Sequence, residues 1–412
     1  MGGGACGRGA GRLIWHEEAM MIFARRERDI VAVDIGTAKV AVAVATVDGD
    51  GPMRLLGVGE SPSAGVRKGE IIEAGAAKEA LRDAMARAEV SAGIEILEVH
   101  LALSGAHLQC TLRSAVVDIR GEGRRVDQED VARVCRAAEE APMPPERVHV
   151  ATLPGRFVID GGEAALRPVG VRGRCLKGEF LIVDGATGVL KDTIRQVQEL
   201  EIRVEDVVLA PVASAEMVLT PELRAAGALL VDMGAGLTHF AAILGDRVVH
   251  VGALGVGGDH VTQDIGRAFA MPWAKAEEVK TRHGSVDAPA GGKADATDLG
   301  GSKPADREPA KAARLAMVMR ARWEEAFEIV RDRIPGEILS ARRGGVVLTG
   351  GGSRTGGIGA LAEQVSGLRT VPARTDGLAG DPEIVSRPEL STVLGSLIWA
   401  RRQIQEEGRG GH

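Results

Sequence analysis

Two stretches of this sequence repeat one pattern: VAVDIGTAKVAVAV (31–44) and LLVDMGAGLTHFAAI (229–243). Each has β-branched or aliphatic residues on both sides of a polar centre that contains Asp-x-Gly, which is typical of a β-hairpin. A glycine-containing turn whose backbone N–H groups face outward forms a concave anion site, and hydroxyl or ammonium side chains add donors. The repeat therefore predicts two similar halves whose hairpins approach one phosphate chain from opposite sides.

The polar residues of the two turns are the candidate phosphate contacts. They are Asp34, Gly36, Thr37 and Lys39 in the first turn, and Asp232, Gly234, Ala235, Gly236 and Thr238 in the second. Carboxylates beside a polyphosphate require a bridging cation, so we expect Asp34 and Asp232 to hold Mg²⁺ through its water ligands. A plain tight turn is the alternative for either segment alone, but the matched pair favours a phosphate site.

A glycine-rich segment extends this predicted site. VVLTGGGSRTGGI (346–358) runs from an apolar strand into Gly350, Gly351 and Gly352 and the hydroxyl of Ser353. A backbone without side chains lets a flat purine or a ribose pack directly against it. The segment predicts the base side of a nucleotide site.

Two charged residues at helical spacing are candidate ribose or adenine contacts. Glu277 and Lys280 in AEEVKTRHG are three residues apart and share one helix face. They offer one acceptor and one donor to a ligand. A solvated ion pair within the helix is the alternative.

Composition narrows the possible classes of protein. The 412 residues suit about two to four subdomains, and 45% hydrophobic with 26% charged residues is ordinary for a globular chain. A net charge of −6 argues against a nucleic-acid partner. The cysteines (Cys6, Cys110, Cys135 and Cys175) lack metal-binding or disulfide spacing, which favours a reducing, cytosolic compartment.

The hydrophobic pattern alternates between strands and helices. Strands are expected over 31–47, 97–103, 115–119, 180–184, 228–232, 238–243, 247–251 and 345–349, and helices over 73–90, 127–140, 187–201, 258–270, 311–334 and 389–405. This alternation predicts an α/β fold. The segment 285–310 is rich in Ala, Gly, Asp and Pro and is expected to be a solvated loop within a domain.

Taken together, these motifs resemble a known family. DIGTAK, VDMGAGLT, GVGGDHVTQDIGRAF, AEEVKTRHG and VLTGGGSRTGGI, in this order, resemble the actin, Hsp70 and sugar-kinase ATPase superfamily, and within it the bacterial cell-division FtsA family. GVGESPSAGVRKGEI, VHLALSGAHLQC and LRPVGVRG resemble FtsA landmarks outside the nucleotide site. The resemblance covers roughly residues 28–402 and adds Gly257 to the nucleotide site.

The resemblance implies an actin-like fold of two halves with an inserted 1C (SHS2-type) subdomain. The implied ranges are 28–93 and 173–208, subdomain 1A; 94–172, subdomain 1C; 209–258 and 336–377, subdomain 2A; 259–335, subdomain 2B; 378–402, a return to 1A; and 403–412, a tail. Residues 1–27 lack an apolar core of signal-peptide length and are expected to be a disordered extension or an untranslated leader.

The resemblance also implies cofactors, partners and a cellular place. These are ATP with Mg²⁺, the C-terminal peptide of FtsZ, self-association into actin-like filaments, later division proteins, and peripheral attachment to the inner face of the cell membrane at the division septum. Within 2B, Arg320, Arg322 and Glu325 are the implied peptide contacts. Solvated surface charge is the alternative for these three residues.

The sequence departs from the family pattern at several positions. Leu237 replaces a small or hydroxyl residue, and His239 stands where a carboxylate is frequent. Ala210 precedes Pro211 where fast ATPases of this fold often have Glu or Gln, so any hydrolysis is expected to be slow. The tail shows no amphipathic anchor helix, and LIWHEEAMMIFARR (13–26) is the better candidate for membrane contact.

Other functions remain open from sequence. A PilM-like pilus-assembly scaffold has a closely related architecture and is the main alternative. A sugar-kinase-type phosphotransferase is less favoured, because no substrate cleft with a catalytic carboxylate is identifiable.

Overall fold

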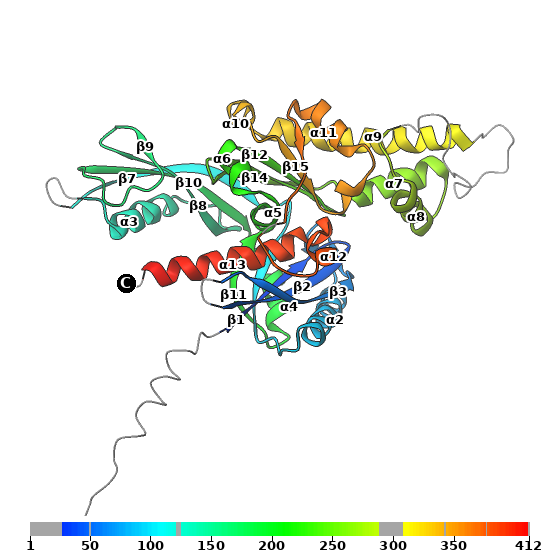
Figure 1. Cartoon of the computed structure of the whole chain (residues 1–412), viewed down its shortest axis with the longest axis horizontal. Coiled ribbons are helices and arrows are strands. Elements are labelled where there is room, and N and C mark those ends of the chain that lie inside the picture. Colours follow the sequence, from blue (N-terminus) through cyan, green and yellow to red (C-terminus); the bar gives the residue numbers. More distant parts are fainter. Residues whose placement is uncertain are drawn as a thin grey trace, which may run out of the picture.

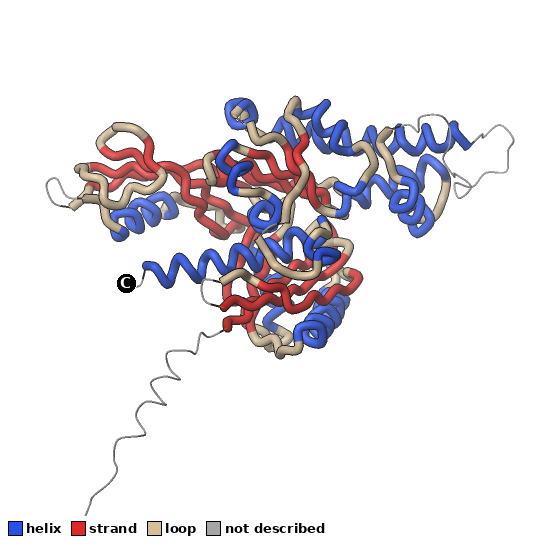
Figure 2. The backbone as a smooth tube through the Cα atoms, viewed as in Figure 1, coloured by secondary structure: helices blue, strands red, loops and turns tan. Residues whose placement is uncertain are grey.

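The computed structural model describes residues 27–48, 51–120, 125–287, 308–341, 343–375 and 377–410. These residues form two similar halves and an inserted unit (Figure 1). In this view the first half lies below the second, and the inserted unit extends from one end of the second half. The two sheet-containing halves also stand out as groups of strands in Figure 2.

The first half is built on a sheet with the order β11-β6-β1-β2-β3. Its strands are β11 (Arg203–Leu209), β6 (Glu98–Leu103), β1 (Glu27–Ile35), β2 (Lys39–Asp48) and β3 (Arg54–Pro62). Helices α2 (Ala74–Ala92) and α4 (Thr187–Gln198) cover one face, and α13 (Ser391–Gly410) covers the other. Successive side chains of β2 point to opposite faces, so Val40 and Val42 pack toward α2 while Ala41 and Ala43 pack toward α13.

The second half repeats this topology. Its sheet has the order β14-β13-β12-β15-β16, with β14 (Arg247–Leu254), β13 (Thr238–Leu244), β12 (Ala228–Met233), β15 (Val346–Thr349) and β16 (Thr370–Val371). In each half the first three strands in sequence are antiparallel and the remaining two run parallel to the first of them. The expectation of two similar halves in an α/β fold is confirmed.

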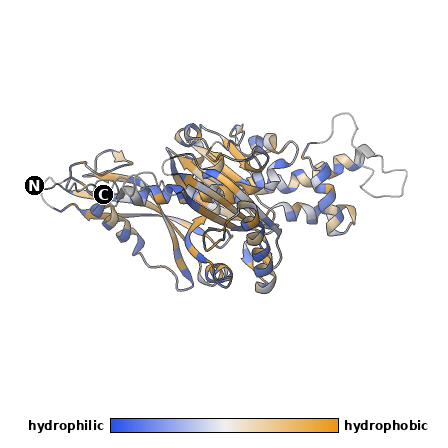
Figure 3. Ribbon diagram, turned by 60° about the horizontal axis from the view of Figure 1, so that its bottom comes forward, coloured by the Kyte–Doolittle hydropathy of each residue, from blue (hydrophilic) through white to orange (hydrophobic). Residues whose placement is uncertain are grey.

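Helices cover both faces of the second sheet. Helix α5 (Ala210–Val218) lies on one face, and α7 (Gly258–Phe269), α9 (Glu308–Arg333) and α11 (Ile358–Ser366) lie on the other. Helix α8 (Trp273–His283) packs on α7, and α6 (Pro221–Ala226) and α10 (Gly336–Ser340) lie in the connections. Figure 3 shows the most hydrophobic segments gathered in the strands at the centre.

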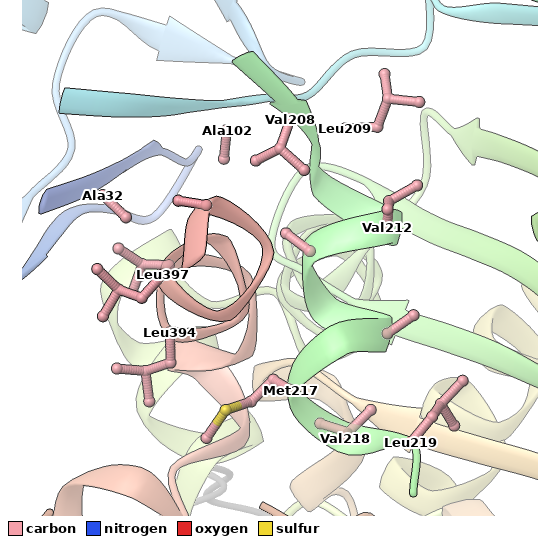
Figure 4. Close-up of a cluster of buried hydrophobic side chains, with 14 of the residues drawn as sticks. Ala32, Ala102, Val208, Leu209, Val212, Met217, Val218, Leu219, Leu394 and Leu397 are labelled. Atoms are coloured by element: carbon pink, nitrogen blue, oxygen red, sulfur yellow. The ribbon is translucent and has the colours of Figure 1, made fainter. Parts of the chain in front are cut away.

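Two helices, α5 and α13, meet where the halves join (Figure 4). Leu394 and Leu397 of α13 share one buried cluster with Val212 and Met217 of α5. The helices approach so closely that a Cβ at Gly395 would overlap the carbonyl oxygen of Ala213 on α5. The junction between the halves is therefore a close backbone contact that requires glycine.

The inserted unit is a separate antiparallel sheet with one helix. Its strands are β7 (Gln109–Asp118), β10 (Cys175–Ala186), β8 (Arg147–Ile159) and β9 (Ala164–Ala165), in that spatial order, and α3 (Gln128–Glu139) packs on one face. Asp127 caps α3, accepting a hydrogen bond from the backbone N–H of Asp130 at 2.9 Å. Phe157 and Phe180 pack edge to face in its core.

The position of this unit in the sequence differs from the expected range 94–172. Strand β6, within that range, pairs with β1 and β11 in the first sheet, whereas β10, beyond it, pairs with β7 and β8 of the insert. The periodicity that marks a strand does not say which sheet it joins, because that depends on hydrogen bonds to distant strands. The insert thus begins after β6 and ends with β10.

Several short elements complete the described chain. They are β4 (Val66–Arg67), β5 (Glu70–Ile71), and, towards the end, η2 (Gly351–Arg354), α12 (Pro382–Val385) and η3 (Pro388–Leu390). Helix α13 continues through the first residues of the expected tail 403–412. The expected extension 1–27, apart from Glu27 in β1, and most of the expected loop 285–310 lie outside the described residues. Among the described helices, none is both long and apolar enough to cross a membrane.

Candidate functional site

A cavity of about 550 Å³ is lined by residues of both halves. Most of the predicted site residues line it: Asp34, Gly36, Thr37, Lys39, Asp232, Gly234, Ala235, Gly236, Glu277, Lys280, Gly350, Gly351 and Gly352. They come from the two hairpin turns, from α8 and from the glycine turn after β15. The fold therefore brings all four predicted segments to one place.

Three predicted residues support the walls of the cavity and do not line it. The Thr238 hydroxyl donates to a backbone carbonyl at 2.9 Å, and the Ser353 hydroxyl donates to another at 2.7 Å. Gly257, immediately before α7, packs against the backbone of the second turn too closely for a Cβ. Their roles in the structure are local packing and hydrogen bonding.

The first turn is closed by its own backbone. The Gly36 N–H donates to the Lys39 carbonyl at 3.0 Å, and a Cβ at Gly36 would lie 2.9 Å from that oxygen. This close approach explains the glycine. Gly36 and Thr37 both line the cavity.

The Asp34 carboxylate lies in an environment that disfavours its charge. Burial raises its pKa from 3.8 to about 7, with a further increase from the charge of Asp232, while Lys39 acts in the opposite direction. No donor among the described residues hydrogen-bonds this carboxylate. Two close carboxylates, one of them without a donor, form an oxygen donor set that suits a hard divalent cation such as Mg²⁺.

The second carboxylate is held rigidly by helices from the junction. Asp232 accepts hydrogen bonds on Oδ2 from the hydroxyls of Ser214 on α5, at 2.6 Å, and Thr392 on α13, at 3.2 Å. Gly350, with φ of +78°, lies against Oδ1 so closely that a Cβ would overlap it. The cavity end of β12 is thereby tied to both helices that join the halves.

Glu277 and Lys280 form the ion pair that was the alternative expectation for them, and they do so at the cavity wall. Their side chains form an ion pair at 2.7 Å along α8, and both line the cavity. The Thr262 hydroxyl donates to Glu277 at 2.5 Å, and the Lys280 ammonium donates to the Gly258 carbonyl at 3.1 Å. An acceptor and a donor are therefore fixed side by side at the wall.

Comparisons with known proteins identify the family. A family model described as "Cell division protein FtsA" matches residues 229–395, and one described as "SHS2 domain inserted in FTSA" matches residues 105–184. The cell division protein FtsA of Borreliella burgdorferi is 30% identical over 382 residues, which are 91% of this chain and 91% of that protein. The chain belongs to the FtsA family of cell division proteins. The SHS2 match also agrees with the strand pairing of the insert.

Solved structures show the same fold at low sequence identity. The PilM-PilN type IV pilus biogenesis complex matches with a TM-score of 0.59 and 18% identity, covering 90% of this chain and 98% of that chain. MreB5 of Spiroplasma citri bound to AMPPNP matches with a TM-score of 0.56 and 14% identity, covering 93% and 99%. These likenesses confirm the actin-like fold that the sequence predicted for this FtsA-family chain.

The cavity wall also contains charged residues that the sequence analysis missed. Glu60, Arg354, Arg387 and Glu389 all line it. Glu60 is on β3, whereas Arg387 lies 327 residues later, just before η3. No local pattern links residues so far apart. Only Arg354 carried a sequence signal, because it directly follows the predicted site residue Ser353.

Two of the positions that depart from the family pattern, Leu237 and His239, are buried in the second hairpin. Leu237 lies against Gly69, at the tip of the β4–β5 hairpin of the first half. His239 is opposite Asp232 in the β12–β13 pairing, and burial lowers its pKa although the charge of Asp232 acts to raise it. Its Nε2 has no hydrogen-bond partner within the described part of the chain. Residue 239 is thus a neutral polar group at the cavity wall.

The three predicted partner contacts do not form one free surface. Arg322 pairs with Asp264 of α7 at 2.7 Å and with Glu325 on its own helix. Arg320, two residues earlier, points elsewhere and donates to Gln364 of α11 at 2.6 Å. Residues two apart on a helix face different directions, which explains the divergence.

Proposed function

We propose that this FtsA-family chain binds ATP with Mg²⁺ in the cavity between its halves. The observation that carries the proposal is the convergence of two glycine turns, a glycine ledge and two carboxylates on one cavity of about 550 Å³. Backbone N–H groups at glycine turns suit phosphates, and an open glycine backbone suits a flat base. A relative of this fold, MreB5, is described as bound to AMPPNP.

Each part of the cavity has a proposed role towards the nucleotide. The turns at 34–39 and 232–238 contact phosphates, and Asp34 and Asp232 hold Mg²⁺ through its waters. The ledge Gly350–Gly352 receives the adenine, and Glu277 with Lys280 contacts the ribose or the base. Thr238, Gly257 and Ser353 support these contacts from behind.

In the cell, the proposed role is to recruit and tether FtsZ filaments at the division septum and to help assemble the division complex. Subdomain 2B, at 259–335, receives the FtsZ C-terminal peptide, with Arg320, Arg322 and Glu325 as contacts that first release their internal partners. The chain self-associates into actin-like filaments, and later division proteins join it. Its proposed place is the cytoplasmic face of the membrane, as a peripheral protein.

ATP is proposed to act mainly as a conformational and polymerisation switch. Helix α5 begins at Ala210 and Pro211, where no carboxylate or amide is available to orient an attacking water. Hydrolysis is therefore slow. Turnover of the purified chain well above about one per second would contradict this proposal.

Two measurements test the proposed function. Calorimetry of the full chain with ATP and Mg²⁺ should show saturable binding, and a pull-down should capture FtsZ in preference to pilus proteins such as PilN. Capture of pilus proteins without FtsZ would favour the PilM-like alternative. Phosphate transfer to a sugar would favour a kinase.

A further inference from the structure

Five residues of alternating charge form a continuous chain along one wall of the cavity. The Lys39 ammonium lies 2.6 Å from Glu60, and Arg387 donates to both oxygens of Glu60 at 2.5 and 2.9 Å. Arg387 also donates to Glu389 at 3.0 Å, and Glu389 pairs with Arg354 at 3.0 Å. All five side chains line the cavity.

The chain of charges crosses from one half to the other. Lys39 and Glu60 are on β2 and β3 of the first half, where they lie diagonally across the paired strands. Arg354 ends η2, which contains part of the glycine ledge of the second half. Arg387 and Glu389, in the segment before α13, connect these two ends. The phosphate side and the base side of the cavity are thus linked by ion pairs.

The Glu60 carboxylate pairs with two cationic side chains, Lys39 and Arg387. Burial acts to raise its pKa, but the hydrogen bonds from Arg387 and Lys39 outweigh burial, so that the pKa is lowered and the side chain is ionised. Its side chain is 27% exposed, so water screens these ion pairs only partly. A phosphate that approaches Lys39 therefore competes with a carboxylate already in contact with it.

We propose that Glu60 sets the phosphate affinity of the cavity by holding Lys39 and Arg387, so that a bound nucleotide must take Lys39 from it. This inference rests on the proposed ATP site and goes beyond it, because it assigns an opposing role to a residue outside the phosphate turns. Glu60 is a positioning residue that acts through Lys39. When Lys39 pairs with the phosphate, Glu60 stays paired with Arg387 alone. Nucleotide binding therefore changes the ion pairs that link the two halves.

The test is calorimetry of the full chain with Mg²⁺ and ATP, comparing the wild type with Glu60→Gln. Removing the negative charge that holds Lys39 should tighten ATP binding roughly five- to tenfold. Adenosine, which lacks phosphates, should bind both proteins equally. Glu60→Asp, which keeps the charge, should bind ATP within about twofold of the wild type.

Two further proteins show whether the effect passes through Lys39. Glu199→Gln removes the same charge from an ion pair with Lys78 outside the cavity and should leave ATP affinity unchanged. In a Lys39→Ala background, Glu60→Gln should give a much smaller gain than in the wild type. The gain in the wild-type background should also shrink at high salt.

The outcomes separate this inference from the proposed function. No binding of ATP by the wild type overturns the ATP site itself. If the wild type binds ATP, then unchanged or weaker binding by Glu60→Gln overturns the role of Glu60. An equal gain in the Lys39→Ala background, or an equal gain for adenosine, also overturns it.

Discussion

Thr37 of the first turn packs directly against Gly236 of the second, so that a Cβ at Gly236 would lie 2.5 Å from the Thr37 hydroxyl oxygen. The two hairpins therefore touch at their tips. This contact joins the two turns at the cavity that both of them line. Any side chain at 236 must therefore displace Thr37.

Gly236→Ala is expected to weaken ATP binding at least tenfold, because the added methyl separates the two turns by a few tenths of an ångström or more. Calorimetry with Mg²⁺ and ATP measures the effect. Gly188→Ala is the matched control, since no atom lies within 4 Å of a Cβ at that position on α4. Unchanged affinity in Gly236→Ala would show that the turns do not act together on one phosphate chain.

Gly351→Arg is expected to abolish ATP binding while leaving the fold intact. A Cβ at Gly351 meets no atom within 4 Å, so the substituted side chain has room to extend along the ledge and fill the place of the base. Calorimetry should show loss of binding, and thermal unfolding should show a melting temperature within a few degrees of the wild type. Unchanged ATP affinity would show that the adenine does not bind on this ledge.

The raised pKa of Asp34 predicts a pH-dependent stability of the nucleotide-free protein. The folded-state pKa of about 7 lies above the ordinary 3.8, so the folded state holds an extra proton between these values. The contribution of this proton to the free energy of unfolding is fully present below about pH 3.8 and is lost as the pH rises through about 7. Urea unfolding in EDTA should show a free energy that falls by up to about 1.4 kcal/mol per pH unit in this window.

Asp34→Asn should remove the contribution of Asp34 to the pH dependence of the unfolding free energy. Asp192→Asn, at an exposed ion pair on α4, should leave that contribution in place. An unchanged slope in Asp34→Asn would assign the pH dependence to other groups. Mg²⁺-ATP should bind more tightly as the pH rises through about 7, because the ionised carboxylate is the form that holds the cation.

Gly395→Ala is expected to destabilise the whole chain by about 1–3 kcal/mol or more, because the methyl overlaps the Ala213 carbonyl where α13 crosses α5. Chemical denaturation measures the change. Gly75→Ala, near the start of α2 with no atom within 4 Å of a Cβ, is the matched control and should be neutral or stabilising. A small effect at 395 would mean that the helices can move apart at little cost.

Removal of the inserted unit is expected to abolish filament formation and to leave ATP binding in place. Gln109 of β7 lies opposite Asp184 of β10, so a short linker can replace residues 109–184. Deletion of 94–172 would instead remove β6, which lies between β11 and β1 in the first sheet. Filaments of the 109–184 variant under electron microscopy would show that the insert is not the longitudinal contact.

Local patterns in the sequence determined much of the fold. The repeated hairpin predicted two halves, and the pairing of β1 with β2 and of β12 with β13 confirms both hairpins. A hairpin can be predicted from sequence because it depends only on neighbouring residues, a turn glycine between two β-branched runs. The glycine ledge and the helices at α2, α3, α7 and α9 were likewise found close to their predicted ranges. Strands β3, β8 and β11 were missed, and Pro154 and Gly155 interrupt the pattern of β8.

Only the tertiary structure decided which distant residues meet. The pairing of β6 and β10 with different sheets, the hold of Ser214 and Thr392 on Asp232, and the contact of Glu60 with Arg387 all join segments far apart in sequence. Periodicity reports which side of an element is apolar, but the partner of a polar side chain depends on how the elements pack. The sequence by itself therefore determined the turns and the ledge, and packing of the two halves decided how their charges are balanced around the cavity.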